Sequence, residues 1–182
     1  SFKPLLVSPF NSRATLMELL EREEKKGADG YVLLKTNHLT DPGIIKKLYA
    51  LADAGVGMDF IVRTTYAMKP HDNIRAISIL DRFLEHQRAY VFGTGDDQKV
   101  YLSSADLMER NLDWRVEVAF PILNEELRKQ VAEMMQLQVE DTSKARFLDE
   151  TQSNPYVGRG RYGCRAQAAT RDYLQKLLDG VE

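Results

Sequence analysis

The sequence predicts an α/β fold in which a mixed, mostly parallel sheet is flanked by helices. Short apolar runs typical of buried strands recur along the chain, and segments with the leucine and isoleucine spacing of a helix lie between them. Strands separated by helices favour parallel pairing. With 182 residues, of which 43% are hydrophobic, the chain can bury one sizeable core. Because there is no internal repeat and no clear second domain, we expect residues 1–182 to form a single domain.

Three strands and two helices are expected in the first third of the chain. The strands are LLVSP, YVLLKT and MDFIVR, at residues 5–9, 31–36 and 58–63. Ser12 can cap a helix that presents leucines on one face before Gly27 ends it. Asp41 followed by Pro42 is typical of an N-cap with proline at the first helical position, so a second helix is expected from there to about Gly55.

The middle of the chain is expected to contain a third helix and a hairpin. From Asn73, apolar residues recur at helical spacing, and this predicted helix leads to Glu85 and His86. The residues that set its spacing are Ile74, Ile77, Leu80 and Leu84. Two strands, AYVF and KVYLSS, follow and are joined by the turn-rich GTGDDQ, as in a β-hairpin.

One strand and two helices are expected in the last third. WRVEVAF, residues 114–120, alternates as a strand does, and Asn124 opens a long helix. Polar, irregular sequence begins at about Asp141, and a final helix closes the chain. The residues expected to dock this helix on the fold are Tyr173, Leu174, Leu177 and Leu178.

Composition argues against several classes of protein. The 25 basic and 27 acidic residues give a formal net charge of -2, so no overall field draws the chain to nucleic acid or anionic lipid, and no nucleic-acid partner is expected. Cys164 is the only cysteine, which rules out an intrachain disulfide and favours a reducing compartment, the cytoplasm. No apolar run approaches the roughly 18 residues of a membrane span, and the N-terminus lacks the pattern of a secretory signal. Because the chain starts at Ser1 and a strand follows almost at once, we expect it to be a piece of a longer protein.

Polar side chains gather at or beyond the carboxyl ends of predicted strands, where α/β proteins bind their ligands. Together with the histidine that lies among them in sequence, these residues are Lys35, Asn37, Arg63, His86, Ser103 and Ser104. Cationic groups neutralise phosphate oxygens, and an imidazole, with an ordinary pKa of about 6.5, exchanges a proton near neutral pH. These residues therefore predict a phosphate site.

Each candidate also has a structural explanation. A histidine between a helix and a strand is often structural or simply exposed, and Arg63 is equally readily explained as a surface arginine. Lys35 fits a side chain that snorkels from a strand end, and Ser104 fits the N-cap of a helix in ADLMERN. GRGRYGCR reads either as a loop or as a small RNA-contacting segment. The residues alone leave these alternatives open.

Most of the chain resembles one bacterial enzyme family. The longest matching runs are NIRAISILDRFLEHQRAYVFG and KVYLSSADLMERNLDWRVEVAFPIL, and the shorter ones are LLVSPFNSR, KTNHLTDPGIIKKLYALADAGV, FIVR, DTSKARFLDE and YVGRGRYGCRAQ. These runs resemble the last domain of the bacterial polyphosphate kinase family, which builds inorganic polyphosphate from ATP. The resemblance covers essentially the whole chain and is more specific than a single short motif.

The resemblance implies a phospholipase D-like fold. Each of the family's two C-terminal domains resembles half of that fold, with the active site between them, and this chain is expected to be the second half. Phospholipase D enzymes carry a His-x-Lys motif in each half, whereas this chain has His86, Gln87 and Arg88. The arginine fits the polyphosphate kinase pattern and argues against a phosphodiesterase. SSADLMERN is similar to the Gly-Ser-x-x-Asn region that follows the histidine motif, although Ser103 replaces the glycine.

The resemblance also assigns roles to residues. The arginine of FIVR is Arg63, which in the family contacts nucleotide phosphates, and the histidine of LEHQR is His86, the second essential histidine. The further ATP or phosphate ligands that we expect are Lys35, Asn37, Arg88, Ser103 and Ser104. For Lys35 and Asn37 this expectation rests on their polarity and their place at a strand end and not on the resemblance. The loop after Arg63, TTYAMKPHD, is shorter than, and different from, the Gly- and Cys-containing loop of many relatives.

Other groups of the active site are expected outside this chain. The resemblance implies that the phosphohistidine, the arginines that hold Mg²⁺ and a nucleotide-contacting tyrosine belong to the preceding domain, and an asparagine to the N-terminal domain. No metal site is expected within this chain. His86 is expected to act as a proton donor, proton acceptor or positioning group opposite the phosphohistidine.

The function implied is reversible transfer of the γ-phosphoryl group of ATP, through the phosphohistidine, to the end of inorganic polyphosphate in the presence of Mg²⁺. The partners implied are ATP, ADP, polyphosphate, the preceding domain of the same polypeptide and further copies of the full-length enzyme in a homo-oligomer. The enzyme is expected in the cytoplasm, with a peripheral position at the inner membrane face as a further possibility. The alternatives are a phospholipase D-like phosphodiesterase or nuclease and a non-enzymatic RNA- or anion-binding module that uses GRGRYGCR.

Overall fold

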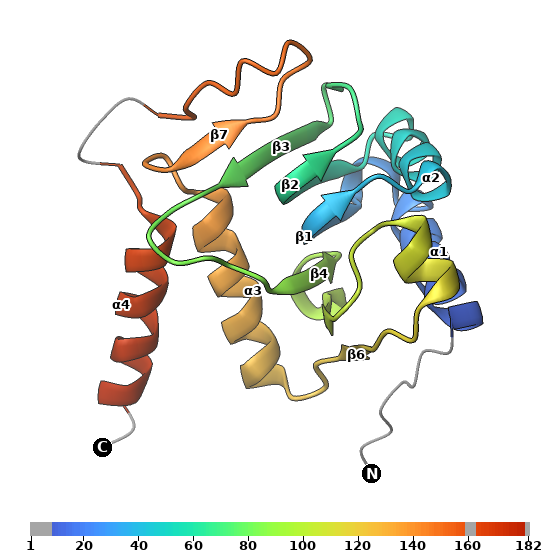
Figure 1. Ribbon diagram of the computed structural model, residues 1–182. Helices are drawn as coiled ribbons and strands as arrows, with labels where there is room; N and C mark the ends of the chain where they lie inside the picture. The colour runs from blue at the N-terminus through green and yellow to red at the C-terminus, as the bar shows by residue number, and fades with distance from the viewer. Residues whose placement is uncertain (1–8, 159–162, 181–182) are drawn as a thin grey trace.

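The computed structural model describes residues 9–158 and 163–180 and contains a central sheet between two pairs of helices (Figure 1). The helices are α1 (Pro9–Glu24), α2 (Pro42–Asp53), α3 (Glu125–Val139) and α4 (Ala166–Asp179). The strands are β1 (Tyr31–Leu39), β2 (Gly57–Tyr66), β3 (Ile74–Ile79), β4 (Arg88–Phe92), β5 (Lys99–Ser103), β6 (Ala119–Pro121) and β7 (Ala145–Phe147). Short 3₁₀ turns cover Gly27–Asp29 and Gly95–Asp97, and a π-helical turn covers Arg110–Trp114.

The strands form one mixed sheet. In the described part of the chain the order is β6-β5-β4-β1-β2-β3-β7. β1, β2 and β3 run parallel to one another, whereas β4, β5, β6 and β7 pair only antiparallel with their neighbours. The predicted α/β class and mixed sheet are confirmed. The expectation of mostly parallel pairing is wrong, because strands joined by short turns, such as β4 and β5, can pair only antiparallel.

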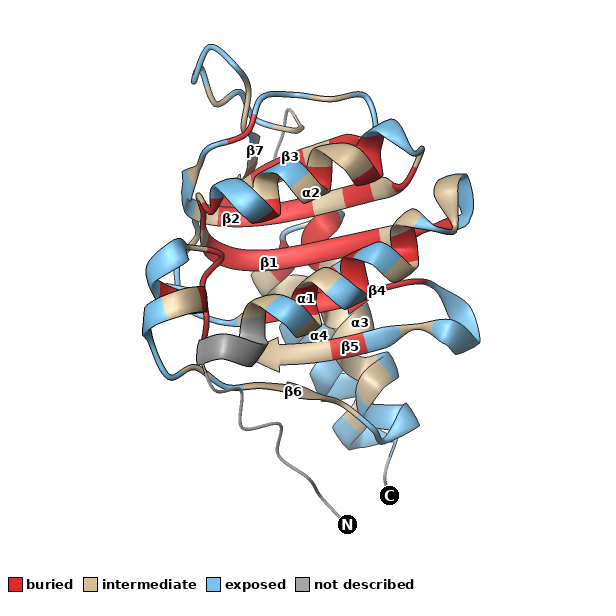
Figure 2. Cartoon of the chain, turned by 90° about the vertical axis from the view of Figure 1, so that its right-hand side faces the viewer, coloured by how far each residue is buried: buried red, intermediate tan, exposed pale blue. Residues whose placement is uncertain are grey.

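Each face of the sheet carries its own apolar core. α1 and α2 pack on one face and α3 and the start of α4 on the other (Figure 1). β1 lies at the centre, and Figure 2 shows it buried along most of its length. Its Val32 and Leu34 enter the core under α1 and α2, and Leu33 enters the opposite core. A strand covered on both faces reads as a continuous apolar run, which is why this strand was predictable.

Several helix termini form as predicted. The carboxylate of Asp41 accepts a hydrogen bond of 2.8 Å from the backbone N–H of Ile44, and Asn124 accepts one of 2.9 Å from Leu127. The prediction for Ser12 is wrong, because α1 already begins at Pro9 and Ser12 lies inside it. Most of the strand predicted at residues 5–9 lies outside the described residues.

The helix predicted from Asn73 is wrong. Residues 74–79 form β3, which pairs parallel with β2 and antiparallel with β7, and residues 80–87 have no regular structure. Leu80 and Leu84, which completed the helical spacing, are 63% and 78% exposed. The isoleucines Ile74 and Ile77 fit a strand as well as a helix, since β-branched side chains favour the pleated surface. Pairing with β2 selected the strand over the helix, although the spacing of the isoleucines fits both.

Two further predictions fail between β5 and α3. The strand expected at residues 114–120 is reduced to β6, which pairs with β5, and Trp114 instead ends the π-helical turn. The helix expected to start after Ser104 does not start there, because Leu107 makes a bridge to Leu39 at the end of β1, and only the last residues of ADLMERN join the π-helical turn. The structure of both segments is determined by contacts with distant strands, which the spacing of apolar residues within a segment cannot predict.

The C-terminal part differs from expectation in one strand and one helix face. β7 lies within the stretch that was expected to be irregular, and its three residues are too few for a periodic signal. α4 forms, but Leu174 and Leu178 on it are 38% and 69% exposed, so this helix docks less completely than expected.

One arginine joins α1 to the start of α2. Arg13 donates to both carboxylate oxygens of Asp41, at 2.7 and 2.6 Å, and to both oxygens of Asp113, at 2.8 and 2.6 Å. Asp41 is 1% exposed. Burial raises the pKa of its carboxyl group, but the hydrogen bonds from Arg13 and the Ile44 backbone outweigh burial, and the pKa is lowered.

We predict that Leu48→Ala destabilises the chain by about 2–5 kcal/mol, because Leu48 is fully buried on the inner face of α2 and its loss leaves a cavity. Leu178→Ala on α4 is the matched control and should cost about 0.5 kcal/mol or less, since that side chain is 69% exposed. Urea unfolding followed by circular dichroism measures both. Equal costs would contradict the assignment of the core.

We predict that Asp41→Asn lowers the free energy of unfolding at neutral pH and makes that free energy depend less on pH in the acid range. Because the folded pKa of Asp41 lies below the unfolded value of about 3.9, the carboxylate stabilises the fold above that pH and this contribution is lost as the pH falls through the folded pKa. The free energy of unfolding should therefore fall less steeply in the variant between about pH 5 and 3. Parallel slopes in the two proteins, measured by urea titration across this range, would argue against the mechanism.

Candidate active site

The candidate residues converge at the edge of the sheet where β1 and β2 end. β4 runs antiparallel to β1 with Ala89 opposite Lys35, and β5 runs antiparallel to β4 with Ser103 opposite Arg88. The carboxyl ends of β1, β2 and β5 and the amino end of β4 therefore lie at the same edge, which we call the carboxyl edge. His86 reaches this edge on the irregular segment of residues 80–87 that leads into β4.

Lys35 holds this segment against the sheet. Its side chain is 6% exposed and forms an ion pair with Glu85 and a hydrogen bond to the side-chain carbonyl of Gln138 on α3. Burial lowers the pKa of Lys35, and the negative charge of Glu85 opposes this effect. The second oxygen of Glu85 accepts a hydrogen bond of 2.9 Å from Gln167 on α4. The charge of Lys35 is thus matched within the protein.

The 80–87 segment is also fastened to the beginning of α4. Arg165 donates to both oxygens of Asp81, at 2.8 and 2.7 Å. The amide of Gln167 accepts from the backbone N–H of Phe83 at 3.1 Å and donates to its carbonyl at 2.8 Å. A segment without regular structure is therefore held by side chains from the start of α4 and from strands β1 and β2.

Arg63 differs from the other two cations at this edge. Lys35 and Arg88 are ion-paired, with Glu85 and Asp106. Arg63 donates through Nη1 to the backbone carbonyl of Glu85 at 2.5 Å, and no carboxylate among the described residues lies within ion-pair distance of it. Of these three cations, Arg63 is therefore the one whose charge is not matched by an ion pair within the described part of the chain.

Asp106 is the acceptor at the centre of the edge. Its Oδ1 accepts from the backbone N–H of Asn37 at 2.9 Å, from the Asn37 amide at 3.1 Å and from the Thr36 hydroxyl at 3.0 Å. Arg88 donates from Nε to Oδ1 and from Nη2 to Oδ2, both at 3.1 Å. Burial raises the pKa of Asp106, but the hydrogen bonds from Arg88, Asn37 and Thr36 together lower it to about 2. The group is therefore a carboxylate at every physiological pH.

His86 is exposed and touches Arg88. Its Nδ1 lies 3.1 Å from Nη1 of Arg88, and the same Nη1 donates to the backbone carbonyl of His86 at 3.0 Å. Because His86 as a residue is exposed, a ligand at the carboxyl edge can reach its ring. The structure thus brings His86 to the edge where Arg63 lies, as the sequence predicted.

The two serines shape the connection between β5 and β6. The Ser103 hydroxyl accepts a hydrogen bond of 3.0 Å from the backbone N–H of Ala105. The Ser104 hydroxyl accepts one of 3.0 Å from the backbone of Val118 and also bonds to the carboxylate of Glu117. The roles of Lys35, Asn37 and these serines as phosphate ligands stay predictions.

Sequence reasoning missed the acceptors that organise the site. In the sequence Glu85 stands out only as the residue before His86, and no motif marks Asp106. Gln138 and Gln167 were missed as well. The available signal was physical rather than a motif: a lysine and an arginine near the ends of buried strands require carboxylates, because an unpaired buried charge is very costly.

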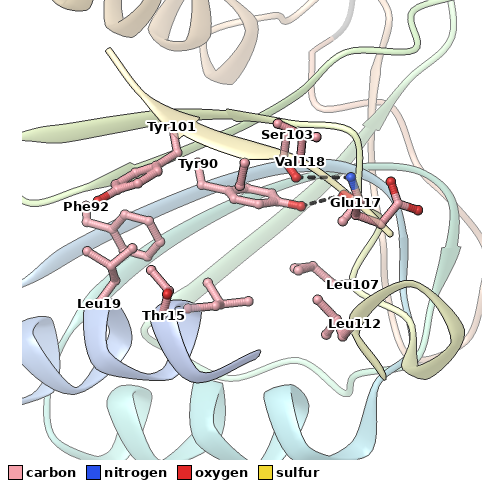
Figure 3. Close-up of a pocket in the computed structure, with 13 residues that line it drawn as sticks. Thr15, Leu19, Tyr90, Phe92, Tyr101, Ser103, Leu107, Leu112, Glu117 and Val118 are labelled. Atoms are coloured by element: carbon pink, nitrogen blue, oxygen red, sulfur yellow. Dashed lines mark hydrogen bonds between the residues drawn. The ribbon is translucent and has the colours of Figure 1, made fainter. Parts of the chain in front are cut away.

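A small cavity lies behind β4 and β5, against α1 (Figure 3). Its volume is about 40 Å³, enough for about one water molecule, and its walls are mostly apolar. The Tyr90 hydroxyl beside it donates to the carbonyl of Ala105 at 2.7 Å. The cavity is a packing gap too small for a substrate, whereas the Tyr90 hydrogen bond fixes the residue that precedes Asp106.

Within the part of the chain that the structure describes, there is neither a metal-binding cluster nor a membrane-spanning helix. No group of three or more His, Cys, Asp or Glu side chains there is arranged to hold a metal ion. None of the helices in these ranges combines the length and apolar character needed to cross a bilayer.

Comparison by sequence finds one family. The family model for polyphosphate kinase C-terminal domain 2 matches residues 5–167. Polyphosphate kinase of Escherichia coli strain K12 is 46% identical over 186 aligned residues, which cover 97% of this chain and 27% of that protein. The chain therefore spans little more than a quarter of the length of this relative.

Comparison by structure agrees with the sequence. The crystal structure of polyphosphate kinase from Porphyromonas gingivalis superimposes with a TM-score of 0.92 at 37% identity, over 99% of this chain and 29% of that one. Nuc from Salmonella typhimurium, a phospholipase D family member, superimposes with a TM-score of 0.56 at 15% identity, over 76% of this chain and 91% of that one. At that identity the second match shows a likeness of fold alone, and it confirms the phospholipase D-like fold that the resemblance implied. With a family model that covers most of its length and a relative 46% identical to it, the chain belongs to the polyphosphate kinase family, as its C-terminal domain 2.

Proposed function

We propose that this chain supplies one side of the active site of a polyphosphate kinase. The enzyme transfers the γ-phosphoryl group of ATP to a histidine nitrogen on the preceding domain, with release of ADP, and then to the terminal oxygen of inorganic polyphosphate. In the first step a P–O bond breaks and a P–N bond forms, and the second step reverses this exchange at the polymer end, so the reaction runs in both directions. In such a transfer the protein mainly positions anions and stabilises moving charge.

The observation that carries this proposal is the pairing pattern at the carboxyl edge. Arg63 has no carboxylate partner among the described residues and bonds to the backbone of Glu85, the residue before the exposed His86, while Lys35 and Arg88 are ion-paired with carboxylates. A guanidinium with free N–H groups suits the non-bridging oxygens of a phosphate. Arg63 therefore binds the nucleotide phosphates, and His86 assists the transfer from its exposed ring.

An open groove beside His86 supports a neighbouring domain as the other side of the site. It runs between the 80–87 segment and α4, with about 550 Å³ of open space. Apolar side chains stand exposed along it, with Phe83, Leu174 and Leu178 at 65%, 38% and 69%. Exposed apolar patches of this kind mark contact surfaces. We assign the surface to the preceding domain, because most of the length of the relatives lies outside this chain.

Mg²⁺ belongs to the proposed reaction, and we assign its ligands to the preceding domain. The described residues do not fit a metal centre, since no cluster of His, Cys, Asp or Glu side chains is arranged for one. The steps assigned to Arg63 and His86 use only hydrogen bonds and charge.

A phospholipase D-like phosphodiesterase or nuclease is the competing function. It rests on likeness of fold alone, and Arg88 stands where those enzymes carry lysine. The two functions differ in the acceptor, which is water in one and a phosphate chain in the other. Diester hydrolysis without ATP, by a protein that fails to extend polyphosphate, would favour the hydrolase.

We predict that His86→Ala in the full-length enzyme lowers ATP-dependent polyphosphate formation by about 100-fold or more, because assistance by a positioned imidazole contributes on the order of 10²–10⁴ in rate. Radiolabelled polymer formed from γ-labelled ATP measures the effect. Lys129→Ala, a change at an exposed lysine on α3 that does not line the groove beside His86, is the control and should keep near-normal synthesis with an unchanged melting temperature. Near-normal synthesis by His86→Ala would sink the role assigned to His86.

We predict that Arg63→Gln raises the KM for ATP by about 10-fold or more, since it removes charge-assisted hydrogen bonds to phosphate. The matched control is Arg128→Gln, because Arg128 lies on the first turn of α3 beside Lys99, at the opposite end of β5. Initial rates at varied ATP concentration measure both variants. A KM for ATP that is the same in Arg63→Gln as in the unmodified enzyme would contradict nucleotide binding by Arg63.

A further inference from the structure

The guanidinium of Arg88 is almost fully occupied, and it faces a carboxylate on one side and His86 on the other. Nε and Nη2 donate to Asp106, both at 3.1 Å. Nη1 carries two hydrogens and has two acceptors, the carbonyl of His86 at 3.0 Å and its Nδ1 at 3.1 Å. Four of the five N–H groups of this arginine are thereby used within the protein.

The contact with Nδ1 determines where the proton of a neutral His86 ring lies. A guanidinium can only donate, and it is not deprotonated in proteins. Nδ1 must therefore accept, and a neutral imidazole that accepts at Nδ1 carries its hydrogen on Nε2. Since Arg88 covers Nδ1 and His86 is exposed, Nε2–H is the group that the ring presents at the carboxyl edge.

Arg88 can hold the ring because Asp106 holds Arg88. The side chains of Arg88 and Asp106 are 12% and 8% exposed, and Asp106 also accepts from Thr36 and Asn37 at the end of β1. A chain of hydrogen bonds therefore runs from the central strand of the sheet to the exposed ring. Bonds of this kind orient a functional histidine through its second nitrogen.

We propose that Asp106 and Arg88 are positioning residues that fix neutral His86 as its Nε2–H tautomer, so that the ring acts as a hydrogen-bond donor to an anionic phosphoryl oxygen and not as a nucleophile. This inference rests on the proposed function for the identity of the anion. A ring in this tautomer has no free lone pair on either nitrogen, so no bond to phosphorus forms on His86. The phosphoryl carrier is then a different histidine, as the proposed function requires.

Lysine cannot replace Arg88 in this arrangement. Its ammonium carries three hydrogens on one atom, whereas the guanidinium spreads its donors over a planar fork. One nitrogen cannot hold both oxygens of Asp106 and reach the ring of His86 with the geometry seen here. Arg88→Lys therefore keeps the positive charge and removes the planar set of donors. The variant thus tests the positioning of His86 separately from the effect of the charge.

The first test is spectroscopic and independent of activity. In the 182-residue chain labelled with ¹⁵N-histidine, long-range ¹H–¹⁵N spectra near pH 8.5, where free imidazole is neutral, report the proton on each ring nitrogen. The chain has three histidines, and loss of one set of signals in His86→Gln assigns His86. The urea-unfolded chain supplies the shifts of a ring that averages its tautomers.

We expect the Nδ1 and Nε2 shifts of His86 to be further apart than in the unfolded chain, with the hydrogen on Nε2. In Arg88→Lys and Asp106→Asn they should move towards the unfolded values, and in Gln87→Ala they should not. If Asp106→Asn does not fold, the His86 shifts in Arg88→Lys alone test whether the tautomer is fixed by this arrangement. Unfolded-like shifts in the unmodified chain, or unchanged shifts in a folded Arg88→Lys, would overturn the proposal.

The second test measures the full-length enzyme. Arg88→Lys should lower kcat on the order of 10- to 100-fold while KM for ATP changes by about threefold or less, because the variant disturbs the orientation of His86 and not nucleotide binding. A large rise in KM with unchanged kcat and unchanged His86 shifts would make Arg88 a direct phosphate ligand and refute the positioning role. If His86→Ala keeps its activity, the proposed function of His86 falls, whereas the ring shifts still decide whether Arg88 fixes the tautomer.

Discussion

Two buried ion pairs, Lys35 with Glu85 and Arg88 with Asp106, organise the carboxyl edge of this sheet. The central strand is covered on both faces, so its polar end residues leave water when the sheet forms. An ionised group in such a place is tolerated only when it is paired and hydrogen-bonded. Glu85 draws the 80–87 segment onto β1, and Asp106 draws in the connection that follows β5. Satisfying two buried charges therefore also assembles the candidate site.

The same pairing decides which groups remain for a ligand. Lys35 and Arg88 have the residue types of phosphate ligands, yet their charges are matched inside the protein. Within the residues that the structure describes, Arg63 donates only to a backbone carbonyl, and the exposed His86 is held through one ring nitrogen. A surface that neutralises most of its own charge and leaves one cation beside one imidazole suits the transfer of a phosphoryl group between other partners better than tight storage of an anion.

The mixed pairing of the sheet has a direct consequence for the site. β4 runs antiparallel to β1, so Arg88 and the preceding His86 reach the edge where β1 and β2 end. A parallel β4 would have carried both residues to the opposite edge, away from Arg63. β5 returns antiparallel, which brings Ser103 and the nearby Asp106 to the same place. The antiparallel pairs thus supply half of the site.

The sequence by itself determined the features that depend on neighbouring residues. The caps at Asp41 and Asn124, the buried strand β1 and the turn between β4 and β5 each carry a local signal, and the family resemblance extended this to Arg63 and His86, whose roles remain predictions. Tertiary structure decided what local spacing leaves open. The isoleucines of β3 fit two periods, and pairing with β2 selected the strand. Glu85 meets Lys35 across 50 residues of sequence, and Asp106 meets Arg88 across 18. Such contacts depend on which buried charges the folded sheet brings together, because the cost of leaving a charge unpaired arises only once the chain has closed around it.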